Sequence, residues 1–308
     1  MPHGLLYGAS FTKGTLSFTD KQGRTICNAD LWDFLTLTAT EDNSSVKLKM
    51  YGTLSNKFEV NVGNGWEGYT FGTVIPLKAG QSCKWRCSAH PTTQTYSDYV
   101  KFVMTGTIEA SGNCNSMLSS DFDNITSLTG YDYAFISLFQ DCSSLIRAPE
   151  LPATTLSKFC YLFMFNGCLS LTQVPSLPAT TLADHCYQYM FSNCNDLTQA
   201  PELPATTLAD SCYQYMFYYS YHLTQAPSLP ATTLANYCYQ SMFSGCSKLK
   251  EARISATTTA SGALSNWLNG VAATGDFYCD PNATIFPSGE SGIPKNWTRH
   301  NIADYPQT

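Results

Sequence analysis

Charge is scarce in this chain of 308 residues, of which only 13% are Asp, Glu, Lys or Arg. That fraction is about half the usual share of a globular protein, and Tyr, Phe, Ser and Thr fill the difference. The net charge of −6 at neutral pH offers no basic surface to a polyanion. We therefore expect no nucleic acid among the partners of this protein.

Long apolar runs are also lacking. The sequence has no stretch of about 18 continuous apolar residues, so we expect a chain that is not membrane-spanning. Residues Met1 to Phe18 lack the charged segment and following apolar segment of a secretory signal, and the run from Gly4 to Gly8 is too short for that role. We therefore expect that a secretory signal is either absent or has been removed from this sequence.

Metal-binding and catalytic motifs are missing as well. The five histidines lack the spacing of a metal site, and Cys83 and Cys87 have no second pair at zinc-finger distance. For that pair we favour a structural thiol or a local disulfide over zinc. No Gly-rich phosphate loop follows a strand, and Gly-x-Ser-x-Gly is absent. We expect no metal, no cofactor and no enzymatic activity.

An internal repeat dominates what is present. The hexapeptide Leu-Pro-Ala-Thr-Thr-Leu occurs four times at a step of 26 residues, starting at Leu151, Leu177, Leu203 and Leu229. A fixed period of this size is typical of a solenoid, in which each unit buries its apolar face against its neighbours. Such proteins usually bind through an extended surface.

One repeat unit divides into two halves. In the first half Leu197 and Ala200 are spaced as inward residues of a strand, and the prolines that follow keep that strand very short. In the second half Leu208, Cys212 and Met216 lie at i, i+4 and i+8, the spacing of one helical face. We therefore expect a helical turn or short helix there, capped by a preceding threonine.

Eight of the thirteen cysteines fall in two repeat columns, Cys142, Cys168, Cys194 and Cys246 in one and Cys160, Cys186, Cys212 and Cys238 in the other. The first column holds Ser220 where a fifth cysteine is expected. A column that accepts serine needs a small buried residue, so we predict reduced, buried thiols. Stacked units are close enough for disulfides, which stay the alternative.

The repeat resembles a known family. Its pattern, Met-Phe-x-x-Cys-x-x-Leu-x-x-Ala-Pro-x-Leu-Pro-Ala-Thr-Thr-Leu, is similar to the BspA-like leucine-rich repeats in surface proteins of gut and oral bacteria and of their phages. The resemblance covers about residues 133–259, and the segment from Gly292 to Trp297 resembles the closing segment of such proteins. It implies extracellular adhesion to host proteins or glycans, an implication by analogy because fold does not determine function.

The flanking regions suggest further parts. Segments 35–40, 46–50, 58–62 and 101–104 alternate apolar and polar residues with turns between them, which predicts an immunoglobulin-like β-sandwich over 30–112. We expect an arm or extra strand at 1–29, a linker or N-terminal cap at 113–132, the solenoid at 133–259 and a C-terminal cap at 260–308. The predicted fold class is mixed α+β.

Two side-chain ladders are candidate binding surfaces. The first consists of Gln173, Gln199 and Gln225, and its favoured interpretation is a hydrogen-bonded ladder that stabilises the stack. The second is aromatic, and tyrosine gives large contact area at low entropic cost. Its candidate ligand-binding residues are Tyr189, Tyr215, Tyr218, Tyr219, Tyr221 and His222.

The segment Tyr218 to His222 departs from the Ser-Asn-Cys or Ser-Gly-Cys of other units, which is the best indication of a ligand-contacting patch. Packing is the favoured interpretation of the faithfully repeated Tyr187, Tyr213 and Tyr239. We therefore predict a non-enzymatic adhesion or receptor-binding protein for a cell-surface glycan or protein. It would act outside the cell, on a cell surface or as a virion appendage. The alternative is a structural subunit that docks to other virion or surface subunits.

Overall fold

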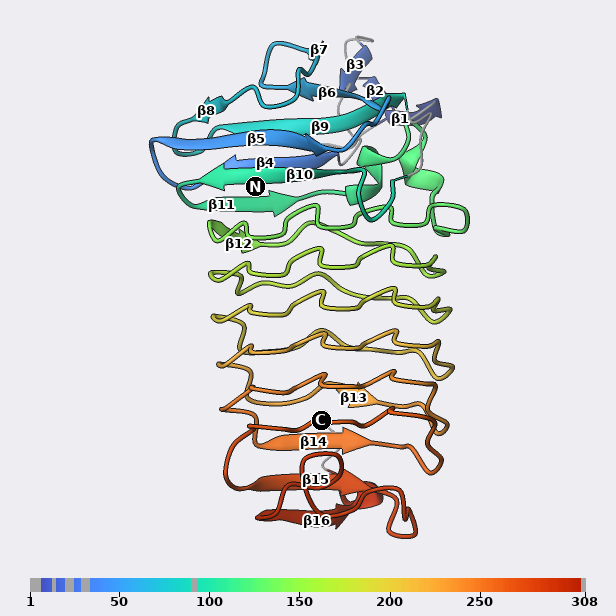
Figure 1. Cartoon of the computed structure of the whole chain (residues 1–308). Coiled ribbons are helices and arrows are strands. Elements are labelled where there is room, and N and C mark those ends of the chain that lie inside the picture. Colours follow the sequence, from blue (N-terminus) through green and yellow to red (C-terminus); the bar gives the residue numbers. More distant parts are fainter. Residues whose placement is uncertain (1–6, 13–14, 20–24, 29–33, 90–93, 306–308) are drawn as a thin grey trace.

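The computed structural model describes residues 7–12, 15–19, 25–28, 34–89 and 94–305, and these are almost entirely β and turn (Figure 1). The prediction of a mixed α+β fold is wrong. The described residues contain no α-helix, and their helical segments are three short 3₁₀ turns, η1 (Cys114–Met117), η2 (Phe122–Asn124) and η3 (Ile302–Asp304).

The N-terminal part is built from antiparallel sheets. The first sheet has the order β1-β2-β3, with β1 (Tyr7–Thr12), β2 (Thr15–Thr19) and β3 (Thr25–Asn28). Eight further strands of the described chain follow before it turns toward the repeats, and the last of them is β11 (Ile108–Ser111). The first seven are β4 (Leu35–Ala39), β5 (Ser44–Tyr51), β6 (Lys57–Asn61), β7 (Trp66–Gly68), β8 (Ile75–Leu77), β9 (Ser82–Ala89) and β10 (Tyr99–Thr105).

Two sheets enclose the core of this part. One has the order β10-β5-β8, and the other has the order β12-β11-β4-β9-β6-β7, with β11 (Ile108–Ser111) and β12 (Leu145–Arg147). The alternating segments of the sequence correspond to β4, β5, β6 and β10, and every second residue of β4 is buried. Trp85 and Phe102 are fully buried in the core, with ring centroids 5.1 Å apart.

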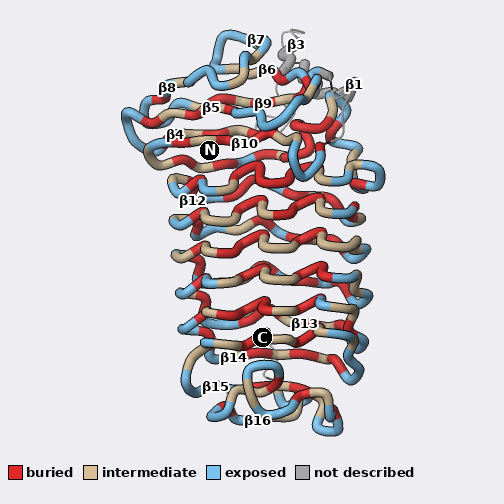
Figure 2. Tube along the Cα trace, viewed as in Figure 1, coloured by how far each residue is buried: buried red, intermediate tan, exposed pale blue. Residues whose placement is uncertain are grey.

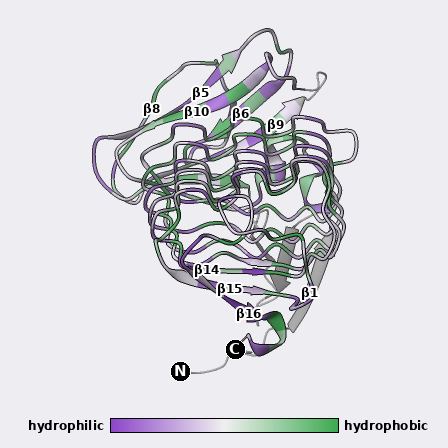
Figure 3. Ribbon diagram, turned by 60° about the horizontal axis from the view of Figure 1, so that its bottom comes forward, coloured by the Kyte–Doolittle hydropathy of each residue, from purple (hydrophilic) through white to green (hydrophobic). Residues whose placement is uncertain are grey.

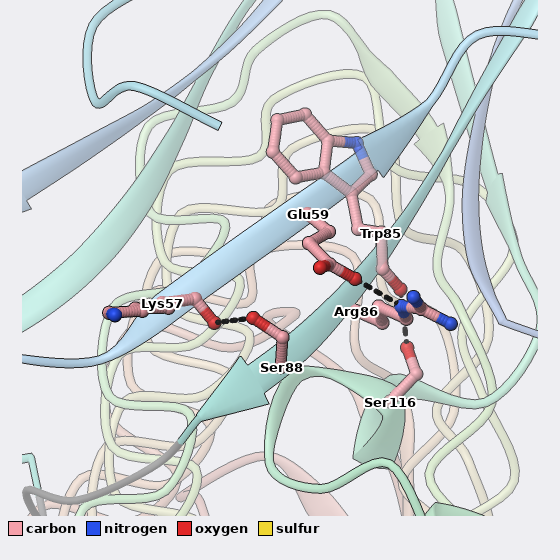
Figure 4. A network of polar contacts seen from close by, with 6 residues as sticks. All are labelled: Lys57, Glu59, Trp85, Arg86, Ser88 and Ser116. Atoms are coloured by element: carbon pink, nitrogen blue, oxygen red, sulfur yellow. Dashed lines mark hydrogen bonds and ion pairs between the residues drawn. The ribbon is translucent and has the colours of Figure 1, made fainter. Parts of the chain in front are cut away.

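A polar network ties the strands to the connection that follows (Figure 4). Ser116 Oγ in η1 donates to the Trp85 carbonyl at 2.9 Å and accepts from the Leu35 N–H at 3.0 Å. Arg86 Nε donates to Glu59 Oε2 at 2.6 Å. Because Ser116 is buried, its two bonds satisfy backbone groups of both β4 and β9 at the point where the chain leaves the sheet.

The repeat region continues directly from this sheet. β12 pairs in parallel with β11, so the first coil supplies the sixth strand of this sheet. The Phe102 N–H donates to the Leu138 carbonyl at 2.8 Å, and the Phe102 ring stacks on Phe139 at 5.3 Å. The N-terminal sandwich therefore forms one end of the stack (Figure 1).

The expected helix in each repeat is a run of consecutive turns instead. The Gln188 N–H donates to the His185 carbonyl three residues earlier, and the Tyr187 N–H donates to the Cys212 carbonyl in the next coil. This alternation recurs along the coils and leaves no N–H for the i→i−4 bonds of an α-helix. The coils follow closely similar, nested paths when the molecule is tilted to bring its C-terminal end forward (Figure 3).

Positive backbone φ angles set the period of these turns. In one coil they fall at His185, Tyr189 and Asn193, with φ of 58°, 56° and 58°. The step is four residues, so the inward pair Cys186 and Tyr187 is followed by Met190 and Phe191, all buried. The apolar spacing that indicates a helical face is therefore produced by a four-residue turn. The helix-capping role expected of the threonines is wrong for the same reason.

Buried residues recur along every coil (Figure 2), and stacked aromatic rings fill the inside of the coils. One column runs Phe139, Phe165, Phe191, Phe217 and Phe243, with centroid separations of 5.5 to 5.8 Å. A second column runs Phe135, Tyr161, Tyr187, Tyr213 and Tyr239, with separations of 5.5 to 5.9 Å. Tyr187, Tyr213 and Tyr239 are buried, which agrees with the packing interpretation.

The strand half of the repeat is reduced to isolated bridges such as Arg147 with Gln173, and a further column of bridges joins Thr155 to Thr181 between the two halves. The stack ends in a parallel sheet of order β13-β14-β15-β16, made of β13 (Ser228–Leu229), β14 (Glu251–Ile254), β15 (Gly275–Cys279) and β16 (Trp297–Asn301). The turns continue past residue 259, since the Tyr237 N–H donates to the Ser261 carbonyl.

Candidate functional site

Five tyrosines form a contiguous cluster on two adjacent coils, which we call the tyrosine patch: Tyr189, Tyr215, Tyr218, Tyr219 and Tyr221. Tyr189 and Tyr215 stack with centroids 4.5 Å apart and planes 4° apart. Tyr218 meets Tyr215 edge-on at 5.4 Å, and Tyr219 lies 4.2 Å from Tyr218 and 5.7 Å from Tyr221. The structure thus brings these predicted site residues together.

Tyr219 occupies a backbone position that other coils give to different residues. Its φ is 57°, in the left-handed region that costs an ordinary side chain free energy. The equivalent residues of the other coils have positive φ too, and they are types that tolerate it: Asp141, Gly167, Asn193, Gly245 and Gly270. Tyr219 is therefore the single large side chain in this column of the described coils.

Most other described aromatic residues with positive φ have stacking partners on neighbouring coils, and Tyr237 is the exception. Phe159 stacks between Tyr133 and His185 at 4.7 and 4.6 Å, and Phe163 stacks on Tyr189 at 5.0 Å. Ring stacking adds favourable energy that offsets backbone strain. Tyr219 has Asn193 and Gly245 as its column neighbours, so its ring contacts lie within its own coil.

Gly245 makes room for the Tyr219 ring. A Cβ atom at Gly245 would overlap the ring at Cδ1, and an alanine there would force the ring to move. The next coil also carries Ser241, Ser244 and Ser247 in the columns of Tyr215, Tyr218 and Tyr221. Large rings on one coil are therefore followed by short side chains on the next.

The patch is half-buried at one side and exposed at the other. Tyr219 and Tyr221 are 39% and 41% exposed, whereas Tyr189, Tyr215 and Tyr218 are half-buried. Burial, together with the neighbouring Tyr215, raises the pKa of Tyr189 to about 12. The hydrogen bond with Tyr219 raises the pKa of Tyr218. These phenols remain neutral at physiological pH and can both donate and accept hydrogen bonds.

His222 lies beside the patch without joining its ring contacts. Its Nδ1 is 3.8 Å from Asp196 Oδ1 on the preceding coil. Both side chains are substantially exposed, and such pairs contribute little to stability.

Gln173, Gln199 and Gln225 are exposed on a different segment of the coils. Gln173 lines a groove of about 540 Å³ whose wall includes four prolines, and Gln199 and Gln225 line a smaller one of about 270 Å³. Gln225 Nε2 donates to Glu251 and to the Tyr305 hydroxyl, the latter at 2.8 Å. Within the described chain, no hydrogen bond joins the three glutamines to one another, so the predicted ladder is absent there.

A glutamine ladder does exist, at Gln188, Gln214 and Gln240. The Gln188 side-chain amide donates to Gln214, and that of Gln214 donates to Gln240, in each case one coil further. The sequence signal was available, because the three residues follow buried tyrosines at the same 26-residue step. They are half-buried, so their role is to satisfy one another within the stack.

The twelve cysteines with described side chains are buried free thiols. Cys194 Sγ donates to the Phe165 carbonyl at 3.2 Å, and Cys246 Sγ donates to the Phe217 carbonyl at 3.0 Å. Ser220 Oγ makes the same bond to Phe191 at 2.8 Å. This column needs a small hydrogen-bond donor as well as a small volume, which explains why serine replaces cysteine there.

In the described part of the chain, no group of three His, Cys, Asp or Glu side chains is arranged to hold a metal ion. No described helix has the length and apolarity needed to cross a bilayer. Comparison of the chain with protein-family models, curated proteins and solved structures found no match. The resemblance to BspA-like repeats therefore stays a prediction from the sequence.

Proposed function

We propose that this chain is a non-enzymatic recognition protein whose tyrosine patch contacts a glycan or protein on a cell surface. Exposed aromatic rings with hydroxyl groups provide both apolar contact area and hydrogen-bonding groups at low entropic cost. The rigid coils beneath hold the rings in place, so little conformational freedom is lost when a ligand binds.

The observation that carries the proposal is Tyr219. Tyr219 has φ of 57° and 39% exposure and lacks a stacked partner on the adjacent coils. Tyr237 shares these features but has no ring contact among the described residues, whereas Tyr219 lies in a contiguous cluster of rings with Tyr218 and Tyr221. The column of Tyr219 accepts Gly, Asn or Asp elsewhere, so folding alone does not require tyrosine. Backbone strain that folding does not require is characteristic of functional positions.

The proposal also covers where the protein acts and its lack of enzymatic activity. A BspA-like repeat protein would act outside the cell, on a cell surface or as a virion appendage. Burial raises the pKa of Cys186 and Cys238 to about 12, which makes these thiols poor nucleophiles at neutral pH and argues against cysteine catalysis.

A second candidate function is that of a structural subunit that docks to another virion or surface protein. The parallel sheet ends at β16, and no other strand of the described chain pairs with its outer edge. An open strand edge is a template for pairing with another chain. This candidate predicts oligomers or a co-purifying partner, and indifference to cells.

The test is the binding of fluorescently labelled protein to a panel of intact gut-bacterial cells. Saturable binding that falls at least ten-fold when Tyr218, Tyr219 and Tyr221 are replaced by the Ser, Gly and Asn of neighbouring coils supports recognition through the patch. Equal binding by wild type and this variant, or no binding to any cells, contradicts it.

A further inference from the structure

The columns that contain the tyrosine patch hold no charged side chain in three successive coils. The patch columns in the preceding coil hold Tyr189, Ser192, Asn193 and Asn195, and in the following coil they hold Ser241, Ser244, Gly245 and Ser247. Across three coils these columns combine aromatic rings with hydroxyl and amide groups. Charged side chains begin in the next column, with Asp196 beside His222, and Lys248 after them.

The rings of the patch differ in what they can offer a ligand. Tyr189 is stacked between Phe163 at 5.0 Å and Tyr215 at 4.5 Å, so both of its faces are covered, and Tyr215 has one face covered by Tyr189. Tyr219 and Tyr221 are the exposed rings of the patch, and their planes are inclined at 41° to one another. Two inclined exposed rings beside short polar side chains make a surface suited to a ring-shaped, polyhydroxylated group.

We infer that the ligand of the tyrosine patch is a neutral glycan, an inference that rests on the function proposed above. A pyranose presents a C–H face that packs on an aromatic ring and hydroxyl groups that both donate and accept hydrogen bonds. Tyr, Ser and Asn side chains also donate and accept, and they match this requirement without a net charge.

Other ligand classes fit these columns less well. An anionic glycan would be paired with Arg or Lys, which recognise carboxylate and sulfate groups through charge-assisted bonds. A protein ligand would be expected to meet a larger dry centre with arginine or fully buried aromatic anchors. The patch columns of these three coils contain neither arginine nor lysine.

The experiment uses polysaccharide purified from cells that the full chain binds, separated by anion exchange into neutral and acidic fractions. We expect the neutral fraction to compete with cell binding and the acidic fraction to compete at least ten-fold less well. Periodate treatment of the cells, which cleaves vicinal diols, should abolish binding, and protease treatment should not. Binding should change less than two-fold on adding salt, because neutral partners are not screened.

Matched variants assign the result to the patch. Tyr219→Gly and Tyr221→Asn introduce the residues that neighbouring coils have in these two columns. Both variants should bind the neutral fraction at least ten-fold more weakly than the wild type. Tyr237→Ser is the control, because Tyr237 is 43% exposed with φ of 54° and the preceding coil has Ser211 there. Its binding should equal that of the wild type.

The outcomes separate the two proposals. Loss of binding in the patch variants together with protease sensitivity, or with competition by the acidic fraction alone, overturns the neutral glycan and leaves recognition by the patch intact. Patch variants that bind cells like the wild type overturn both, as does a wild type that binds no cells.

Discussion

At the scale of single residues, the cysteine columns combine packing with hydrogen bonding. Ser220 and the cysteines above and below it donate to a phenylalanine carbonyl of the preceding coil. Their burial was predictable from the sequence, because a residue that recurs at each repeat in one column faces the core. The hydrogen bond was not, since cysteine is usually read as a small hydrophobe.

Ser220 provides the first prediction. Ser220→Ala removes the 2.8 Å bond to the Phe191 carbonyl and should lower the free energy of unfolding by about 1 kcal/mol. Ser220→Cys restores the residue of the neighbouring coils and should stay close to wild type. Denaturant unfolding measures both, and equal stability of the alanine variant and wild type would show that the bond does not contribute.

A pH dependence follows from the buried thiols. Burial raises the pKa of Cys186 and Cys238 from 9.0 to about 12, so the folded state holds their protons more tightly than the unfolded state. The resulting stability is fully present below pH 9 and is lost as the pH rises from 9 toward 12.

Urea unfolding in reductant should therefore give a free energy that is constant to about pH 8 and falls above pH 9. A Cys27→Ser background removes the thiol whose side chain is not described. In that background a thiol-specific reagent should label the native protein only after denaturant is added. Rapid stoichiometric labelling of the native protein would contradict the burial of the columns.

The sequence also indicated the tyrosine patch, through the departure of residues 218–222 from the repeat. It did not indicate the right glutamine ladder. Gln173, Gln199 and Gln225 follow the same period as Gln188, Gln214 and Gln240, and only coordinates show that the second set is within bonding distance. Periodicity identifies a column but not the direction of its side chains.

At the scale of elements, the second half of the repeat was predicted to be helical because its apolar spacing fits both a short helix and a series of four-residue turns. Inward residues at a step of four drift by about 40° per step on an α-helix, so a segment of nine residues stays within one helical face. A turn of four residues produces the same pattern. The positive φ at Tyr189 and Tyr215 is invisible in the sequence, because tyrosine is rare in that region.

Gly245 offers a prediction at this scale. Gly245→Ala and Gly270→Ala should each lower the free energy of unfolding by about 1 kcal/mol, since both glycines have positive φ in the same column. Gly245→Ala should lower the free energy of unfolding by about 1–3 kcal/mol more, because the added methyl group would overlap the Tyr219 ring. Gly270 has only ordinary contacts at that point.

In a Tyr219→Gly background the two alanine substitutions should lower the free energy of unfolding by the same amount. A double-mutant cycle measured by denaturant unfolding tests this. An excess cost of Gly245→Ala that persists without the tyrosine ring would contradict the assigned contact.

At the scale of the whole molecule, the sandwich and the coils share one core. β11 pairs with β12, and the aromatic column of the coils begins at Phe102 in the sandwich. The strands and the repeat were predictable from local alternation and period. Their junction was not, because the β11–β12 pairing joins two segments that share no sequence pattern.

Phe102→Ala tests this shared core. Phe102 is fully buried between Trp85 and Phe139, so its truncation should cost about 3–5 kcal/mol. Hydrogen exchange should show protection falling together in residues 34–111 and 133–254. A loss confined to the sandwich would mean that the two parts unfold independently.

The central claim is that Tyr219 serves recognition at the expense of stability. The most direct measurement compares wild type and Tyr219→Gly in cell binding and in denaturant unfolding on the same preparations. We predict that Tyr219→Gly is as stable as wild type or up to ~1 kcal/mol more stable, because strain is relieved, and that it binds cells at least ten-fold more weakly. Unchanged binding, or a clear loss of stability, would contradict the account by making Tyr219 a structural residue.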